Sequence, residues 1–219
     1  MATDHCGSIS AFFRWSEMAL RQLAINLTDL GYEFENEAGP LGFAESDALV
    51  VAVEARFGEL PAAYRAFYQT FCFVDFRQAG HQLHTQGAEV SGLGFNCPLV
   101  FEPLYKIDGM RAELAECGVP VESEGRHFLP TGSSASNCES KGVWVPSRAL
   151  DPVLFDEGAG PVSLIEEVRD AILAGGFPFW MSMLRRSRRT SPLGFSPPYP
   201  ELLPRLLKGI EPPQPISAA

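Results

Sequence analysis

The stretch that decides the fold is residues 53–71, VEARFGELPAAYRAFYQTF. Gly58 interrupts this stretch, and Pro61 follows shortly after. Glycine commonly ends a helix because it adopts the left-handed conformation without a Cβ penalty. Proline is tolerated in the first turn of a helix, where its missing N–H is not needed. The stretch therefore predicts the end of one helix, a tight break and the start of a second helix.

Apolar residues repeat at helical spacing on both sides of this break. Ser46 is suited to cap the first helix because its hydroxyl can accept a hydrogen bond from a free backbone N–H. The expected core positions of that helix are Leu49, Val50, Val53 and Phe57. After the break, the i, i+3, i+4, i+7 spacing gives an aromatic stripe of Tyr64, Phe67, Tyr68 and Phe71. Both helices are predicted to face a common core, and Glu54 and Arg65 either brace the break or are solvated.

Composition indicates an ordinary globular domain. The chain has 219 residues, of which 46% are hydrophobic and 20% are charged, which is enough to bury roughly 70% of the unfolded surface. No run approaches the roughly 18 apolar residues that cross a bilayer, and the N-terminal residues MATDHCGSISAFF do not resemble a signal peptide. The 5 cysteines are odd in number and form no CxxC pair. We therefore expect a reducing, cytoplasmic location.

The charge balance favours a basic partner. The formal net charge is −10, although Arg185, Arg186, Arg188 and Arg189 are among the 17 basic residues, so the rest of the chain is more acidic still. Such a surface repels nucleic acid and anionic membranes and attracts basic proteins. The arginine run could contact phosphates, but a basic run just after the last core segment is more often a solvated edge. We expect neither a nucleic-acid partner nor a membrane partner.

Further helices are predicted along the chain, at residues 16–30, 108–117, 163–173 and 202–207. The first repeats leucines at helical spacing and ends at Gly31. Ser163 and Glu166 form a capping-box pattern, which marks the start of the helix at residues 163–173, and Gly175 and Gly176 mark its end.

Strands are predicted at residues 126–130, 142–146 and 152–155, separated by turn-forming residues. This spacing is typical of a meander of antiparallel strands. Tyr32 and Phe34 are expected in another short strand, and the run at residues 98–104 in one or two more. The aromatic segment FPFW, residues 177–180, is expected to close the core.

The predicted fold class is α+β, with a several-stranded, largely antiparallel sheet and helices packed against it. Residues 1–184 are expected to form one domain that contains an irregular insertion at about residues 75–118. Residues 185–219 are expected to form a basic, proline-rich C-terminal extension, because repeated prolines disfavour helix and sheet.

Catalytic and metal-binding patterns are weak throughout. His81 and His84 lie three residues apart, but no third ligand, HExxH pattern or Cys/His cluster accompanies them. The serine-rich residues 132–140 lack a GxSxG elbow, and residues 92–94 lack the third glycine of a dinucleotide loop. We expect no catalytic residue, no metal and no cofactor. A small hydrolase using His81, His84 or His127 is an alternative without a supporting constellation.

The break in residues 53–71 resembles the hallmark of the SUKH superfamily, the Smi/Knr-type immunity and cell-wall-regulator proteins. The resemblance rests on Glu54, Phe57, Gly58, Leu60, Pro61, Tyr64, Arg65, Phe67 and Tyr68, in that order. Residues 127–132 resemble the central strand of the family, residues 151–156 a later strand and residues 163–173 its closing helix. The Asn-Gly that often follows the Leu-Pro helix is absent here, and the family pattern does not include the basic, proline-rich C-terminus.

This resemblance implies an α+β domain without a catalytic apparatus. Many bacterial members are antidotes that bind a cognate toxin of a type VI or contact-dependent secretion system. The acidic charge of this chain agrees with such a role, since a toxin that acts on nucleic acid presents a basic cleft. The resemblance therefore implies an immunity protein that blocks its toxin by stoichiometric occlusion.

Acidic side chains in the predicted loops are the candidate contacts with such a toxin. The candidates are Glu122, Glu124, Glu139, Asp151, Asp156 and Glu157. Each could equally be a solvated surface charge. The alternative function is that of a regulatory or scaffold protein of the same fold that binds a cellular enzyme. The sequence leaves the oligomeric state open.

Overall fold

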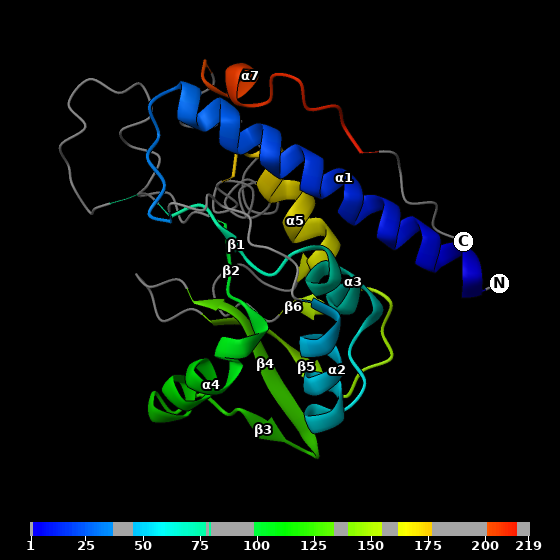
Figure 1. Ribbon diagram of the computed structural model, residues 1–219. Helices are drawn as coiled ribbons and strands as arrows, with labels where there is room; N and C mark the ends of the chain where they lie inside the picture. Colours follow the sequence, from blue (N-terminus) through cyan, green and yellow to red (C-terminus); the bar gives the residue numbers. More distant parts are fainter. Residues whose placement is uncertain are drawn as a thin grey trace, which may run out of the picture.

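The computed structural model describes residues 2–36, 46–77, 79, 99–133, 140–154, 162–176 and 201–213, without the side chains of residues 2–7, 46, 132, 133 and 140. In these ranges helices and short strands combine in an α+β fold, as expected (Figure 1). The helices are α1 (Ala2–Asp29), α2 (Ser46–Phe57), α3 (Ala62–Thr70), the 3-10 turn η2 (Leu104–Lys106), α4 (Ile107–Glu116), α5 (Leu164–Leu173) and α7 (Leu203–Leu206). None of these described helices could cross a membrane.

The described strands pair in three small antiparallel sheets. Their bounds are β1 (Val74–Asp75), β2 (Val100–Phe101), β3 (Glu122–Ser123), β4 (Arg126–Ser133), β5 (Ser140–Val145), β6 (Val153–Leu154) and β7 (Val162–Ser163). The sheet orders are β1-β2, β3-β4-β5 and β6-β7. The predicted meander is therefore correct for β4 and β5 but wrong for its third strand, because β6 pairs with β7 and not with β5.

The loop after β5 explains why the meander ends. Ser147 donates its backbone N–H to the carbonyl of Glu59 at 2.9 Å. The carbonyls of Ala149 and Leu150 then accept the N–H groups of Ala62 and Ala63 at the start of α3, at 3.1 and 2.8 Å. Because α3 has no side-chain cap, this loop satisfies two of its free N–H groups. The residues after β5 therefore turn toward the start of α3 and do not lead directly into a strand paired with β5.

The break between α2 and α3 has the predicted form. Gly58 adopts φ +92°, and a Cβ at this position would lie 2.9 Å from Cβ of Pro146. Glu54 accepts the N–H of Leu60 at 3.1 Å and pairs with the guanidinium of Arg65, whose Nε lies 3.0 Å away. One carboxylate therefore joins the end of α2, the break and α3, so Glu54 and Arg65 brace the break.

The first helix extends far beyond its predicted start at Ser16. Ile9, Phe12 and Phe13 are buried and continue the stripe that the leucines of α1 form. Ser16 does not begin the helix, because its hydroxyl donates to the carbonyl of Phe12 at 2.9 Å, one turn earlier within α1. A serine that hydrogen-bonds back along a helix is compatible with its interior.

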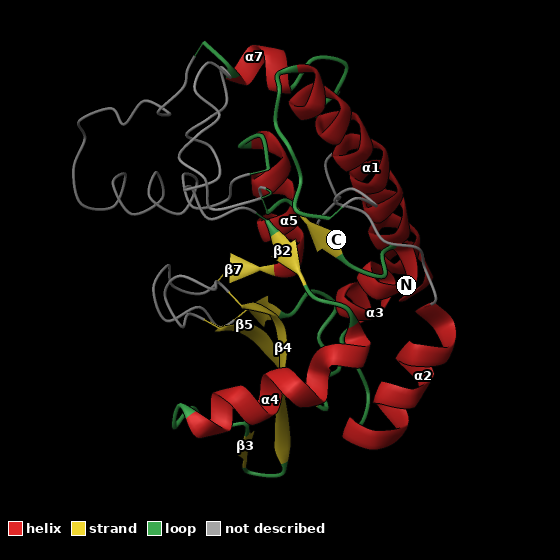
Figure 2. Cartoon of the chain, turned by 60° about the vertical axis from the view of Figure 1, so that its left-hand side comes forward, coloured by secondary structure: helices red, strands yellow, loops and turns green. Residues whose placement is uncertain are grey.

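The core lies where α1 packs on α3 and α5 and where α2 packs on α3. Figure 1 shows α1 and α7 at one end of the molecule, with β3, β4 and α4 at the other, and Figure 2 shows the same order from the side. The predicted core positions Val50, Val53 and Phe57 of α2 and the aromatic stripe of α3 are buried. Leu49 is half-buried and packs against the core.

Residues 99–118, part of the predicted insertion, contribute directly to this core. Leu99, Phe101, Leu104 and Ile107 are buried. The backbone N–H of Glu102 donates to the carbonyl of Thr131 at 2.8 Å, which links β2 to β4. The predicted short strand and the helix of this segment are both present, as β2 and α4.

Several other local predictions are confirmed. Ser163 and Glu166 form a capping box at the start of α5, and Gly175 and Gly176 after its end adopt φ +73° and +95°. Phe34 forms a single bridge and no strand of its own. Residues 177–180, predicted to close the core, lie outside the described residues.

Candidate functional site

The structure describes three of the six predicted contact residues. Glu122 lies in β3, Glu124 lies in the turn between β3 and β4, and Asp151 lies in the loop before β6. Glu139, Asp156 and Glu157 lie outside the described residues. The structure thus brings Glu122 and Glu124 together on one hairpin.

The β3–β4 hairpin has a tight turn of two residues. Ser123 pairs with Arg126, which leaves Glu124 and Gly125 as the loop. Their φ angles are +50° and +72°, as a type I′ turn requires at both central positions. Glu124 is an unusual choice there, since a side chain in the left-handed region costs about 1 kcal/mol. Its side chain is 83% exposed, so the turn displays a carboxylate to solvent.

Glu122 displays a second carboxylate beside this turn. It directly opposes His127 on β4, and its Oε1 lies 3.5 Å from Nδ1 of that residue. The same oxygen accepts a hydrogen bond from Nη2 of Arg111 at 3.2 Å. Since the Glu122 side chain is 68% exposed, it stays accessible to a partner while these contacts orient it.

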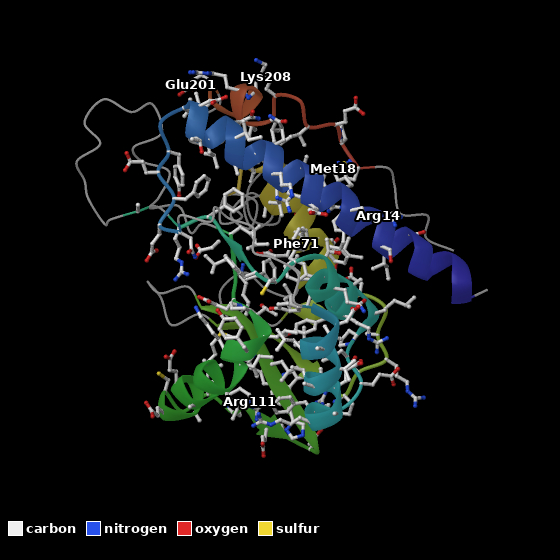
Figure 3. The ribbon with its side chains drawn as sticks, in the orientation of Figure 1. Arg14, Met18, Phe71, Arg111, Glu201 and Lys208 are labelled. Atoms are coloured by element: carbon white, nitrogen blue, oxygen red, sulfur yellow. The ribbon has the colours of Figure 1, made fainter. Side chains whose placement is uncertain are left out.

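Arg111 anchors the hairpin to α4. It is buried, and its Nη1 donates to the carbonyls of Phe128 at 2.7 Å and Val121 at 3.2 Å. Its guanidinium carbon lies 5.0 Å from the centre of the Phe57 ring on α2, a cation–π contact. Figure 3 labels Arg111 at this end of the molecule. One side chain therefore holds α2, α4 and β4 together beneath the hairpin.

Helix α4 adds exposed carboxylates to the same end. It contacts β4, and Asp108, Glu113 and Glu116 lie exposed on it. Asp108 forms an exposed ion pair with Arg56 of α2 at 2.6 Å. We call this set the acidic end; it comprises Asp108, Glu113, Glu116, Glu122 and Glu124.

Sequence reasoning missed the α4 members of the acidic end. Their only signal was carboxylates spaced along a predicted helix, which is also the pattern of an ordinary solvated face. The packing of α4 against β4 places them beside the hairpin, and that contact is not visible in the sequence.

Asp151 has a structural role. Its Oδ1 accepts the N–H of Ile165 in the first turn of α5 at 3.2 Å. Burial raises the pKa of Asp151 above its ordinary value, although hydrogen bonds from Ser163 and from the backbone of α5 oppose that shift. Its carboxylate therefore caps α5, where the helix dipole favours a negative charge.

A second group of charges surrounds Arg77 after β1. The guanidinium pairs with Asp75, whose Oδ1 lies 2.9 Å from Nε, and Glu102 lies 3.5 Å from Nη2. Glu102 also binds Lys106 at 2.7 Å. Burial acts to raise the pKa of Asp75, but the hydrogen bonds from Arg77 outweigh it and hold the pKa below its ordinary value.

A hollow of about 40 Å³ lies beside these charges. A few water molecules would fill such a volume. Because Asp75 and Glu102 are both engaged by bases within it, no carboxylate of the pair is left as a free base or nucleophile. These ion pairs join β1 to the residues that follow β2.

The described residues include no group of three or more His, Cys, Asp or Glu side chains that could hold a metal ion. His81 and His84 lie outside the described residues, and His127 faces Glu122 and the ring of Phe57. Cys72 is half-buried and Cys117 is exposed. The expected absence of a metal, a cofactor and a catalytic residue stays a prediction.

Comparison of the chain with protein-family models, with curated proteins and with solved structures finds no match. The resemblance to the SUKH superfamily therefore stays a prediction that rests on the residues of the α2–α3 break and the segments after it.

Proposed function

We propose that the chain is a non-catalytic immunity protein of SUKH-like fold, which binds a cognate secreted toxin at the acidic end and blocks it by stoichiometric occlusion. The observation that carries the proposal is the β3–β4 hairpin. It presents two exposed carboxylates, that of Glu122 on β3 and that of Glu124 in the turn, where Glu124 keeps a strained conformation. Strain of this kind persists at functional sites because the surrounding structure holds it in place.

The α2–α3 break supports the family assignment on which the proposal depends. Each residue of the resemblance has a structural role there, with Glu54 bonded to Leu60 and Arg65, and with Gly58 pressed against Pro146. A short, degenerate motif is more persuasive when its residues interact as one unit. In the finer fold that we propose, the small sheets described here correspond to parts of one several-stranded, largely antiparallel sheet.

Electrostatics supports a toxin that acts on nucleic acid, delivered by a type VI or contact-dependent system. Such a toxin presents a basic cleft, and exposed carboxylates accelerate association with a basic surface. Arg111, the buried base of the acidic end, is held by Glu122 and two carbonyls. Two exposed arginines, Arg56 and Arg126, pair with Asp108 and Glu124, so the carboxylates of the acidic end outnumber its exposed arginines. A regulatory protein that binds a basic cellular enzyme is the alternative, and the identity of the neighbouring gene distinguishes the two.

The test is co-expression of this chain with the toxin encoded by the adjacent gene. The native chain should restore growth, and the double variant Glu122→Gln/Glu124→Gln should bind the purified toxin at least tenfold more weakly, because it removes both hairpin carboxylates. Isothermal titration calorimetry measures the affinity and the stoichiometry, which should be one to one.

A matched control changes the same net charge away from the acidic end. Asp29 and Glu33 are exposed near the C-terminal end of α1, so Asp29→Asn/Glu33→Gln should keep the native affinity. Equal loss in both variants would show that only overall charge matters. Growth unchanged by the native chain would reject the immunity function.

A further inference from the structure

The C-terminal residues 201–213 lie along α1, opposite the acidic end (Figures 1 and 3). We call these residues the strap. Its helix α7 has only 4 residues, and an isolated helix of that length is not stable in water. The conformation of the strap therefore depends on the surface beneath it.

Two leucines attach the strap to that surface. Leu202 and Leu206 are 5% and 3% exposed. Cδ1 of Leu206 lies 2.8 Å from the point where a Cβ on Gly175 would stand. The absent side chain of Gly175, just after α5, thus makes the space that the leucine fills.

Polar side chains of α1 bind the backbone of the strap. Asn26, which is 8% exposed, donates from Nδ2 to the carbonyls of Leu206 at 2.7 Å and Lys208 at 2.9 Å. Gln22 donates to Oδ1 of Asn26 at 2.9 Å and so orients its amide. Nε1 of Trp15 donates to the carbonyl of Glu211 at 2.8 Å.

These contacts have the form of peptide recognition. Apolar side chains are buried against the surface beneath the strap, and a fixed buried amide binds the carbonyls at the end of a short helix, where no intrahelical donor is available. This surface consists of α1 and the residues after α5, and we call it the strap groove. Each of its contacts is independent of how the strap is connected to the rest of the chain.

We propose that the strap is a detachable ligand of the strap groove and that a second copy of the chain can supply it, which gives a strap-exchanged dimer. Residues 177–200 connect α5 to the strap, and a chain segment of that length spans at most about 80 Å. The connection is therefore long enough to reach a neighbouring copy. Because the contacts are identical in both arrangements, protein concentration sets the balance between them.

Hydrogen exchange on the native chain tests whether the strap detaches. The N–H groups of Leu206, Leu207 and Ile210 are bonded only within the strap. They should exchange at least 100-fold faster than the amides of Leu23 and Leu27 in α1, because local opening exposes them without unfolding the core. Equal rates in the two groups would overturn the proposal.

A labelled synthetic peptide of residues 201–213, added to the full chain, tests binding by a second copy. The peptide should bind saturably by fluorescence anisotropy. A peptide with Leu206→Ser should bind more than tenfold more weakly, because it lacks a buried leucine. A peptide with Lys208→Ser, which changes an exposed side chain, should bind as well as the native peptide.

The chain itself provides the complementary measurements. A full chain with Leu206→Ser in its own strap should take up more native peptide than the native chain does, because its groove is less occupied. Light scattering of the native chain should show a dimer fraction that rises with concentration. Native peptide that does not bind, or a native chain that stays monomeric up to about 1 mM, would overturn the exchange. Since the strap groove and the acidic end are at opposite ends, neither result bears on toxin binding.

Discussion

At the scale of single residues, Gly58 shows how one backbone position decides the geometry of the α2–α3 break. Its φ of +92° disfavours any side chain, and Pro146 occupies the space where a Cβ would lie. Gly118 also has a positive φ, +78°, but nothing lies within 4 Å of its Cβ position. A side chain at Gly118 would meet only the strain of a positive φ, whereas a side chain at Gly58 would also clash with Pro146. Substitutions at the two glycines therefore measure these two effects separately.

We expect Gly58→Ala to lower the free energy of unfolding by about 2–4 kcal/mol, because it adds a clash to the left-handed strain. Gly118→Ala should lower it by only about 1–2 kcal/mol, the conformational part alone. Urea denaturation followed by circular dichroism measures both values. Equal losses would show that Pro146 yields to the new methyl group and that the close contact is unimportant.

Glu124 is the residue at which stability and the proposed function conflict. Asparagine adopts the left-handed region more readily than glutamate and favours a type I′ turn before glycine. Glu124→Asn should therefore raise the free energy of unfolding by about 0.5 kcal/mol, while toxin affinity falls because the carboxylate is lost. Thermal and urea denaturation check the first part, and calorimetry the second.

Glu124→Gln is the control for this substitution, because it removes the charge and keeps the strained backbone. It should lose affinity without any gain in stability. If Glu124→Asn is less stable than the native chain, the turn does not carry the strain that its φ of +50° indicates.

At the scale of elements, the ion pairs around Arg77 connect segments that are distant in the sequence. Asp75 is the last residue of β1, and Arg77 lies two residues after it. Glu102 directly follows β2, and Glu35, on the segment after α1, lies 3.6 Å from the guanidinium of Arg77. Asp75 is 3% exposed, whereas Glu35 is 56% exposed. The buried carboxylate should therefore contribute most of the stability.

We expect Asp75→Asn to lower the free energy of unfolding by about 1–2 kcal/mol at pH 7. This loss is smaller than that for a fully buried ion pair, because solvent partly screens the exposed guanidinium of Arg77. Since the pKa of Asp75 is lowered in the folded protein, its contribution is present above about pH 4, the ordinary value of an unfolded aspartate, and is lost as the pH falls below that value. The difference between native chain and variant should thus shrink in acid. Glu35→Gln should change stability by less than about 0.5 kcal/mol at any pH.

At the scale of the whole molecule, the net charge of −10 acts mainly on the rate of association. Exposed charges attract a basic toxin over distances that salt shortens, since the Debye length is about 10 Å at 0.1 M and about 3 Å at 1 M. We expect the association rate constant to fall at least tenfold between about 0.05 M and 0.5 M salt, with a smaller change in the dissociation rate. Stopped-flow fluorescence with the purified toxin measures both rates.

The outcome that contradicts this expectation is an association rate that does not depend on salt. Contact with the toxin would then be governed by shape and apolar burial, and the acidic end would not steer the encounter. The control pair Asp29→Asn/Glu33→Gln should slow association less than Glu122→Gln/Glu124→Gln, because its charges lie farther from the proposed contact.

What the sequence determined by itself was local. Helical spacing of apolar residues placed α2 and α3, a capping box placed the start of α5, and glycines placed helix ends, because each of these signals acts over one or two turns of chain. It also placed Glu122 and Glu124 in the loop before the predicted strand at residues 126–130, but it missed β3, the short strand that contains Glu122. The predicted start of α1 at residue 16 was wrong, because the prediction followed the leucines alone. The burial of Phe12 and Phe13 shows that the helix begins earlier.

Only the tertiary structure decided which strands pair and which charges meet. The loop after β5 accepts hydrogen bonds from free N–H groups of α3, and β6 pairs with β7 instead of β5. No periodicity in the sequence indicates this pairing. The acidic end likewise depends on Arg111, which binds α4 to β4 and so places the carboxylates of α4 beside the hairpin. Such contacts join residues that are far apart along the chain, and their energies depend on burial and distance, which exist only after folding.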